Sequence, residues 1–296
     1  MRAVRRIAAA VVTVALLLLV PPGTTASTTM SLVAVESAEG VGWDDGVVWV
    51  LALGSDSRTG EPLEGNADAI ELVALDTRNG RAVAIGIARD SWVEPEGEEP
   101  MKLTETLRAG GPGLVATEVA ELTGATPDYV LTTGFEGFQT MVDSIGVLQV
   151  HSDAAFEDDK YDLVVQEGVN EMDGHTATSY ARSRFPLLND FARQANQQSL
   201  LEAILEQLRT HQDEEGFIEA GAVSALTHLE TDLSPPDLYR FAQALTQINP
   251  RSTATCVIRG TDDMIGTQQV IRLDTTQAKR VAADADNDAT LQGGCA

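Results

Sequence analysis

Short motifs rich in arginine and aspartate stand at the ends of apolar runs in this sequence. They are Gly54-Ser55-Asp56-Ser57-Arg58, Ala67-Asp68-Ala69 and Arg89-Asp90-Ser91. A guanidinium group offers paired donors to phosphate oxygens, and carboxylates are ligands suited to Mg²⁺ or Mn²⁺. The motifs therefore indicate a phosphate-ester site beside a divalent metal, with Asp56 and Asp68 as the metal ligands. Taken singly they also have structural interpretations, a turn with a surface ion pair for the first and a strand-start cap for Asp68.

The densest cluster comes later, as Arg182-Ser183-Arg184 followed by Asp190-Phe191-Ala192-Arg193. A solvated basic turn paired with the abundant carboxylates is the structural alternative. Arg193, however, falls near the N-terminus of an expected helix, where the macrodipole disfavours a cation and favours an anion. A phosphate bound there would offset that conflict.

The overall charge makes these arginines unusual. The chain has a formal net charge of -25 and a pI near 4.3, and most of its 20 basic residues are arginines. Such a field repels nucleic acid and anionic membrane surfaces, which argues against both as the main partner.

The elements that position the motifs alternate between strands and helices. Apolar runs predict strands at 47–53, 69–75, 81–88, 129–132, 147–150, 253–258 and 268–273, with a hairpin at Asn79-Gly80 and a loop at 94–100. Helical spacing is found at 114–122, 135–145, 173–182, 191–208 and 234–245. Since no linker divides residues 47–290, we expect a single layered α/β/α domain with a central, mostly mixed β-sheet.

The N-terminus has the layout of an export signal. Arg2, Arg5 and Arg6 precede an apolar run at 7–20, which is short for the roughly 20 residues of a spanning helix. Residues 1–26 are therefore expected to be a signal peptide cleaved after Ala26, or an uncleaved signal anchor. A flexible tether at 27–46 would follow, then the domain at 47–290 and a C-terminal tail at 291–296. Either signal places the domain outside the cytoplasm, in the cell envelope, secreted or anchored to the membrane.

Cys256 and Cys295 are the only cysteines. In an oxidising compartment they are a candidate disulfide tying the tail to a late strand, with two free thiols as the alternative. The four histidines show no metal-ligand spacing, and His175 is expected at an exposed helix position.

The order of motifs resembles the LytR-CpsA-Psr family of cell-wall glycopolymer transferases. Beyond the motifs above, the resemblance includes Lys102-Leu103, Gly110-Gly111, Asp128-Tyr129-Val130, Gly134-Phe135-Glu136-Gly137-Phe138, Val142-Asp143-Ser144-Ile145-Gly146-Val147, Tyr180-Ala181 and Gln197-Gln198. The chain departs from the family pattern at Asn196, where an arginine is common, at Glu71, where a methionine is common, and at Lys102-Leu103-Thr104-Glu105, which replaces Lys-Ile-Asn-Ala.

This resemblance implies a phosphotransferase that moves a glycopolymer from a polyprenyl-pyrophosphate carrier to peptidoglycan. Assigned by motif, the catalytic residues are Asp56, Arg58, Asp68 and Arg89, the pyrophosphate ligands are Arg89, Arg182, Arg184, Arg193 and Gln197, and Asp56 and Asp68 bind Mg²⁺ or Mn²⁺. The membrane would be reached through the N-terminus or the lipid substrate. Two alternatives remain, a polyprenyl-pyrophosphate hydrolase and a non-catalytic polyprenyl-phosphate binding protein.

A long prenyl chain would need an apolar slot. Phe135, Phe138 and Met141 have the spacing to line one, although core packing is the favoured interpretation for these three. No nucleophile elbow for acyl transfer is present.

Overall fold

A computed structural model describes residues 46–295 except positions 59, 232 and 234. The expected signal at 1–26 and nearly all of the expected tether at 27–46 lie outside the described residues. Among the described helices, none is both long and apolar enough to cross a membrane.

Five strands form the central sheet, in the order β11-β3-β2-β1-β6. They are β1 (Val48–Ser55), β2 (Ala67–Asp76), β3 (Arg81–Gly86), β6 (Tyr129–Gly134) and β11 (Thr253–Val257). β2 runs antiparallel to both β1 and β3, whereas β1 pairs with β6 and β3 with β11 in parallel. The expected mixed sheet is confirmed, and the connection at Asn79-Gly80 closes the β2–β3 hairpin with Gly80 at φ 64°.

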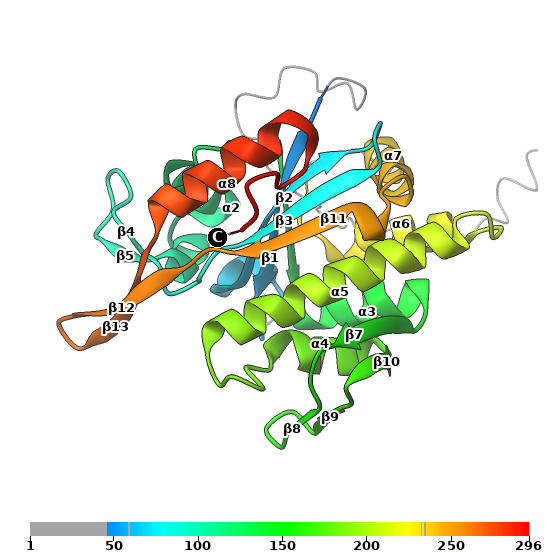
Figure 1. Cartoon of the computed structure of the whole chain (residues 1–296), viewed down its shortest axis with the longest axis horizontal. Helices are drawn as coiled ribbons and strands as arrows, with labels where there is room; N and C mark the ends of the chain where they lie inside the picture. The colour runs from blue at the N-terminus through cyan, green and yellow to red at the C-terminus, as the bar shows by residue number, and fades with distance from the viewer. Residues whose placement is uncertain (1–45, 59, 232, 234, 296) are drawn as a thin grey trace, which may run out of the picture.

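Helices cover both faces of this sheet, which confirms the three-layer α/β/α architecture. α2 (Leu103–Thr123) and α8 (Thr275–Asp288) lie on one side of the strands, and α5 (Asp190–His211) lies on the other (Figure 1). The α2/α8 side buries the main core, with residues such as Leu51, Leu72 and Ile85. The α5 side also carries α3 (Phe135–Ile145), α4 (Gly174–Arg182), α6 (Phe217–His228) and α7 (Pro235–Thr246).

Two expected strands do not join the central sheet. β7 (Leu148–Ser152) pairs with β10 (Gly168–Met172), and β13 (Gln268–Leu273) pairs with β12 (Gly260–Ile265). The strand predicted at 268–273 is therefore present, but the expectation that it completes the central sheet is wrong. Side chains of β7 alternate strictly between buried and exposed, as in a two-stranded ribbon with one solvent-exposed face. This alternation does not determine which other strand β7 pairs with.

Smaller segments complete the fold. β4 (Trp92–Val93) and β5 (Met101–Lys102) flank the expected loop, and β8 (Phe156–Asp158) pairs with β9 (Leu163–Val165). Short 3-10 turns lie at η1 (Pro62–Glu64) and η2 (Pro250–Ser252). α2 begins earlier than expected, at Leu103, and contains a break at Gly111, where φ is 73°.

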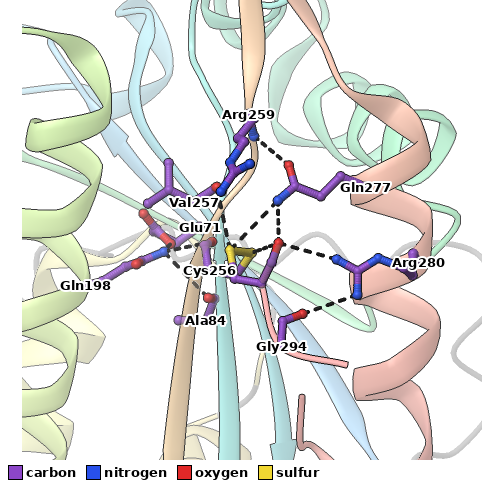
Figure 2. The surroundings of a disulfide bond; sticks show 10 residues. Glu71, Ala84, Gln198, Cys256, Val257, Arg259, Gln277, Arg280 and Gly294 are labelled. Atoms are coloured by element: carbon purple, nitrogen blue, oxygen red, sulfur yellow. Dashed lines mark hydrogen bonds between the residues drawn. A yellow bond between two sulfur atoms is a disulfide. The ribbon is translucent and has the colours of Figure 1, made fainter. Parts of the chain in front are cut away.

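A disulfide joins Cys256 of β11 to Cys295, with 5.2 Å between the Cα atoms (Figure 2). This is the pairing suggested by the two-cysteine count. Gln277 and Arg280 of α8 also donate to the carbonyl oxygen of Cys295, the latter at 3.3 Å. The C-terminal segment is thereby held against β11 and α8.

Candidate active site

The sheet topology brings the aspartate and arginine motifs to one edge. β1, β3 and β6 share a direction, so their carboxyl ends lie together with the amino end of antiparallel β2. The β1–β2 register shifts where Ser55 pairs with Ala67 and Gly54 with Ala69, which leaves Asp68 as the extra residue of a bulge. Bulges redirect side chains, and here Asp68 lines the same cavity as Ala69.

One cavity of about 900 Å³ opens at this edge, near the upper end of sizes usual for ligand sites. Every site residue expected from the motifs lines it: Asp56, Arg58, Asp68, Arg89, Arg182, Arg184, Arg193 and Gln197. Further in, the walls are apolar and come from α3, α5, α6 and α7, with α5 side chains such as Leu200, Leu201 and Ile204. The cavity therefore joins a charged mouth to an apolar interior.

Phe135, Phe138 and Met141 all line this cavity and are half-buried. Phe138 also packs against a core cluster, so cavity lining and core packing are both found on this helix face. α3 turns its apolar face toward a hollow, and helical spacing alone does not distinguish a face that packs against a core from one that borders a cavity.

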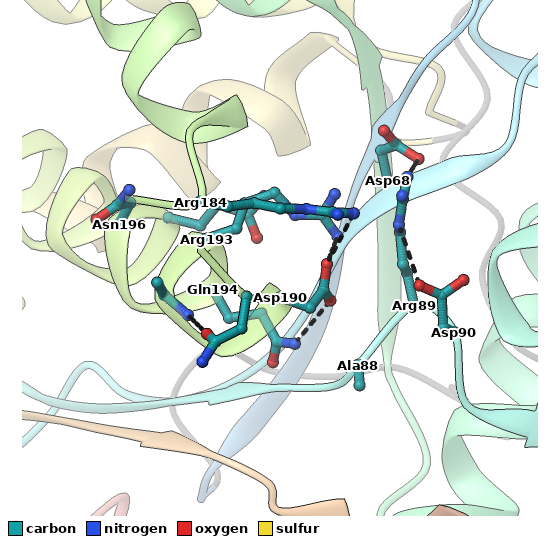
Figure 3. A network of polar contacts seen from close by, with 12 residues as sticks. Asp68, Ala88, Arg89, Asp90, Arg184, Asp190, Arg193, Gln194 and Asn196 are labelled. Atoms are coloured by element: carbon teal, nitrogen blue, oxygen red, sulfur yellow. Dashed lines mark hydrogen bonds and ion pairs between the residues drawn. The ribbon is translucent and has the colours of Figure 1, made fainter. Parts of the chain in front are cut away.

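Arg89 follows β3 and is surrounded by carboxylates. Its Nη1 binds Asp68, and its Nε lies 3.8 Å from Asp90, which also accepts from Lys102 Nζ at 2.9 Å. Burial lowers the pKa of Arg89, but the charges of Asp68 and Asp90 more than offset burial, so that the pKa is raised above its ordinary value. Arg89 therefore stays charged and is fixed in place (Figure 3).

Arg184 and Arg193 converge on a single carboxylate, Asp190 (Figure 3). Arg193 Nη2 lies 2.7 Å from Asp190 Oδ1 and Arg184 Nη2 lies 3.5 Å from the same oxygen. Only 6% of the Arg193 side chain is exposed. Burial lowers the pKa of Arg193, Asp190 opposes that shift, and Arg89 adds to it. The conflict with the helix macrodipole is thus already reduced by an acidic residue in the first turn of α5.

Arg182 is held by aromatic rings. Its guanidinium carbon lies 4.3 Å from the ring centroid of Phe135 and 4.7 Å from that of Tyr161. Lys160 Nζ lies 4.8 Å from the Tyr161 ring. Cation–π contacts orient a cation without neutralising it, so the charge of Arg182 remains available to an anion in the cavity.

Gln197 and Asn196 brace the segment that carries these arginines. Gln197 Nε2 donates to Ala181 O at 3.1 Å, while its buried Oε1 has no partner among the described residues. Asn196 is also buried and donates to Ser183 O at 3.2 Å. Asn196 is not a cavity-lining residue. The asparagine that replaces the family's arginine therefore connects α5 to the end of α4 and does not change the wall of the cavity.

The donor set fits a hard divalent cation. Asp56 accepts from Asn66 N at 2.7 Å through Oδ1, and Asp68 accepts from Arg89 through its own Oδ1, so each carboxylate keeps its second oxygen. No group of three or more His, Cys, Asp or Glu ligands occurs in the part of the chain that the structure describes. Two carboxylates suit Mg²⁺, which usually keeps waters and substrate phosphate oxygens as its other ligands.

Sequence reasoning missed several cavity residues. Asp158, Lys160 and Tyr161 enter the mouth from the β8–β9 segment, and Glu71 lies in the wall formed by β2. Lys160 offered one signal, since lysine is rare in this chain, and Glu71 offered another as a carboxylate within an apolar strand. His175 is exposed and lies outside the cavity lining, as expected.

The site therefore combines clustered arginines at its mouth with a largely apolar cavity wall. The sequence matches the LytR_cpsA_psr family over residues 24–287, and the chain belongs to that family.

Individual relatives agree with this membership. A probable cell wall biosynthesis protein, LcpB of Corynebacterium glutamicum, is 31% identical over 61% of this chain and 46% of its own. The polyisoprenyl-teichoic acid–peptidoglycan teichoic acid transferase TagU of Enterococcus faecalis is 26% identical over 65% of this chain and 64% of its own. The chain thus spans between about half and two thirds of the length of these relatives.

Solved structures share the fold. The crystal structure of Bacillus subtilis TagV superposes with a TM-score of 0.70 at 22% identity, over 83% of this chain and 98% of that one. A structure of TagT bound to LI-WTA also has a TM-score of 0.70 at 22% identity, over 86% of this chain and 96% of that one.

Proposed function

We propose that this protein is an extracytoplasmic phosphotransferase that moves a glycopolymer from a polyprenyl-pyrophosphate carrier to peptidoglycan. The observation that carries the proposal is the cavity that combines Arg89, Arg182, Arg184 and Arg193 at its mouth with an apolar interior. A polyprenyl-pyrophosphate has the matching polarity, with an anionic diphosphate between a sugar and a long hydrocarbon. The name of the relative TagU supports teichoic acid transfer to peptidoglycan, and the name of LcpB supports a part in cell wall biosynthesis.

In the proposed reaction a peptidoglycan sugar hydroxyl attacks the phosphorus next to the glycopolymer. The bond from that phosphorus to the bridging oxygen breaks, polyprenyl phosphate leaves, and the proton of the hydroxyl passes to water. Arg193 and Arg184, held by Asp190, would neutralise charge on the non-bridging oxygens, and Arg182 would do so from α4. Arg58, exposed after β1, would meet the entering headgroup.

Asp56 and Asp68 would hold Mg²⁺ or Mn²⁺ at the same mouth. A bound divalent ion would supply neutralisation of phosphate charge as the attacking and leaving oxygens line up. Asp68 and Arg89 already form an ion pair. The metal ion held by Asp68 and the guanidinium of Arg89 would therefore both lie next to the diphosphate.

The two alternatives use the same cavity. A hydrolase would let water replace the sugar hydroxyl, and a binding protein would hold the lipid without turnover. Asn196 does not favour the binding protein, because its side chain serves the α4–α5 junction and leaves the arginines of the mouth in place.

The test is transfer by the purified protein from a lipid-diphosphate-linked oligosaccharide to a peptidoglycan fragment, with Mg²⁺ present. Under the proposal, a covalent glycan–peptidoglycan product and lipid monophosphate form together, and neither forms with Arg193→Ala. Release of glycan phosphate without any transfer would support the hydrolase. Co-purification of a prenyl phosphate with no turnover of either kind would support the binding protein.

A further inference from the structure

The wall of the cavity contains a buried carboxyl group that the proposed mechanism does not use. Glu71 stands on β2 and is 3% exposed. Around its carboxyl lie Gln194 and Gln198 of α5 and the backbone of Gly86 on β3. A Cβ atom on Gly86 would lie only 2.9 Å from Gln194 Oε1, 3.0 Å from Gln198 Nε2 and 3.1 Å from Glu71 Oε1. These three polar ends thus gather at one point, in space that glycine leaves open.

The orientation of Gln198 is set by the sheet. Its Nε2 donates to Cys256 O at 3.1 Å and to Ala84 O at 3.5 Å, which are carbonyls of β11 and β3 (Figure 2). Because these acceptors hold the amino group on the sheet side, that group is also the donor to Glu71 Oε2, at 3.3 Å. One oxygen of Glu71 is therefore satisfied.

The orientation of Gln194 is set by the arginine site. Its Nε2 donates to Asp190 Oδ2 at 3.3 Å, so its amide oxygen points away from Asp190 (Figure 3). That oxygen, Oε1, and Glu71 Oε1 are both buried, and neither has a hydrogen-bond partner among the described residues. Two acceptors beside the same point can bond directly to each other when one of them carries a proton, and a carboxyl can supply it.

We infer that Glu71 is a protonated acid that donates to the amide oxygen of Gln194 and acts as a positioning residue for the arginine site. It holds Gln194, which holds Asp190, which holds Arg193 and Arg184. The inference rests on the proposed function only in that these two arginines bind the diphosphate.

If Glu71 were ionised, fewer of the buried polar atoms around it would have hydrogen-bond partners. An ionised Glu71 would leave two acceptors facing each other unless the Gln194 amide rotated, and that rotation would place the amide oxygen against the carboxylate of Asp190. Burial raises the pKa of Glu71 to about 8, against the opposing effect of the Gln198 hydrogen bond. Charged groups on neighbouring elements are Asp190 and Arg193 on α5, Asp68 on β2 and Arg89 after β3.

Two substitutions at position 71 separate the proton from the shape of the side chain. Glu71→Gln keeps a donor toward Gln194 and an acceptor toward Gln198 but does not titrate. Glu71→Met keeps much of the volume and has no donor. Glu118→Gln is the matched control, since Glu118 is equally 3% exposed but lies on α2, across the sheet from the cavity.

The readouts are binding of farnesyl diphosphate by calorimetry across a pH series, and the infrared carbonyl band of a protonated carboxylic acid. For the wild type and Glu118→Gln we expect affinity to fall as pH rises through about 8. Glu71→Gln should bind with a flat profile there, and Glu71→Met should bind about tenfold more weakly at neutral pH. The infrared band should be present at neutral pH in the wild type and missing from Glu71→Gln.

A carboxylate band for Glu71 at neutral pH would overturn the inference, as would unchanged affinity in Glu71→Met. If farnesyl diphosphate binds to no variant, the proposed function fails, and the infrared band alone then decides whether Glu71 holds the proton. Melting curves by circular dichroism accompany each variant, and Glu71→Gln keeps the test decisive if Glu71→Met does not fold.

Discussion

Arg193 and Asp190 form an ion pair of 2.7 Å within the first turn of α5, with Arg193 almost fully buried. The carboxylate offsets the unfavourable interaction between a cation and the helix N-terminus, and it also aligns Arg184. A buried guanidinium with only one strong partner is poised to accept a second anion, and Arg193 Nε has no hydrogen-bond partner among the described residues. The local charge balance therefore favours an anionic ligand.

Removing this carboxylate should make the protein depend on added anions for its stability. In Asp190→Asn, Arg193 is left buried without its counter-ion, a change that typically costs about 3–5 kcal/mol. Inorganic pyrophosphate should then raise the melting temperature of the variant by more than it raises that of the wild type.

Asp237→Asn is the control for Asp190→Asn, because it breaks an ion pair of the same i,i+3 spacing between exposed side chains of α7. Its effect should stay within about 0.5 kcal/mol. Equal responses of the two variants to pyrophosphate would argue against an anion site at Arg193.

Alanine at Arg182 or Arg193 should strongly lower turnover, and alanine at Arg182 should also leave the fold intact. Each removes a preorganised charge that faces the cavity, which should cost about 2–4 kcal/mol of transition-state stabilisation. Lysine should rescue Arg182 poorly, since a point charge cannot match a planar guanidinium between the rings of Phe135 and Tyr161. Transfer kinetics measure the effect, with exposed Arg240→Ala as the control, and wild-type rates in both alanine variants would reject the site.

Asn at Asp56 or Asp68 should lower the affinity for the metal ion and leave folding intact. Each substitution removes one ligand charge but keeps size and most hydrogen bonding, so higher Mg²⁺ or Mn²⁺ should restore part of the activity. Pyrophosphate-bond cleavage is measured against metal concentration, and melting temperature is measured with and without EDTA. An unchanged metal response with melting lowered by the equivalent of about 1 kcal/mol would assign both aspartates to the scaffold.

The stability of the wild type should decrease between about pH 4.5 and about pH 8 through Glu71. Its folded pKa lies above the unfolded value, so the folded state binds the extra proton in this window and unfolding is favoured as pH rises. The slope is about 1.4 kcal/mol per pH unit and vanishes above the folded pKa. Urea unfolding of the wild type minus Glu71→Gln isolates this contribution, and parallel curves for the two proteins would contradict it.

The Cys256–Cys295 disulfide should stabilise the C-terminal segment. Alkylation under denaturing conditions should find no free thiols in exported protein, and reduction should lower the free energy of unfolding by about 3–4 kcal/mol, as for loops of this length, given a sequence separation of 39. Two alkylated thiols without reductant would reject the bond in the exported protein.

Local pattern was sufficient for most of the fold. Apolar runs and caps located β1, β2, β3, β6, α3, α4, α5 and α7 to within a few residues. Strand and helix periodicity depends only on residues that are close together in the sequence. Pattern did not determine which sheet β7 and β13 join, since strand pairing depends on contacts between residues far apart in sequence.

The candidate site, too, was partly predictable from the sequence and partly dependent on the tertiary structure. The sequence by itself determined which groups were available, namely arginines and aspartates next to strand ends, in an otherwise acidic chain. Only the tertiary structure decided that these groups share one mouth, that Phe135, Phe138 and Met141 border a cavity, and that Glu71 faces Gln194. Each of those facts depends on distance and burial between separate elements, and the energies of charge and hydrogen bonding are set by those quantities rather than by residue type alone.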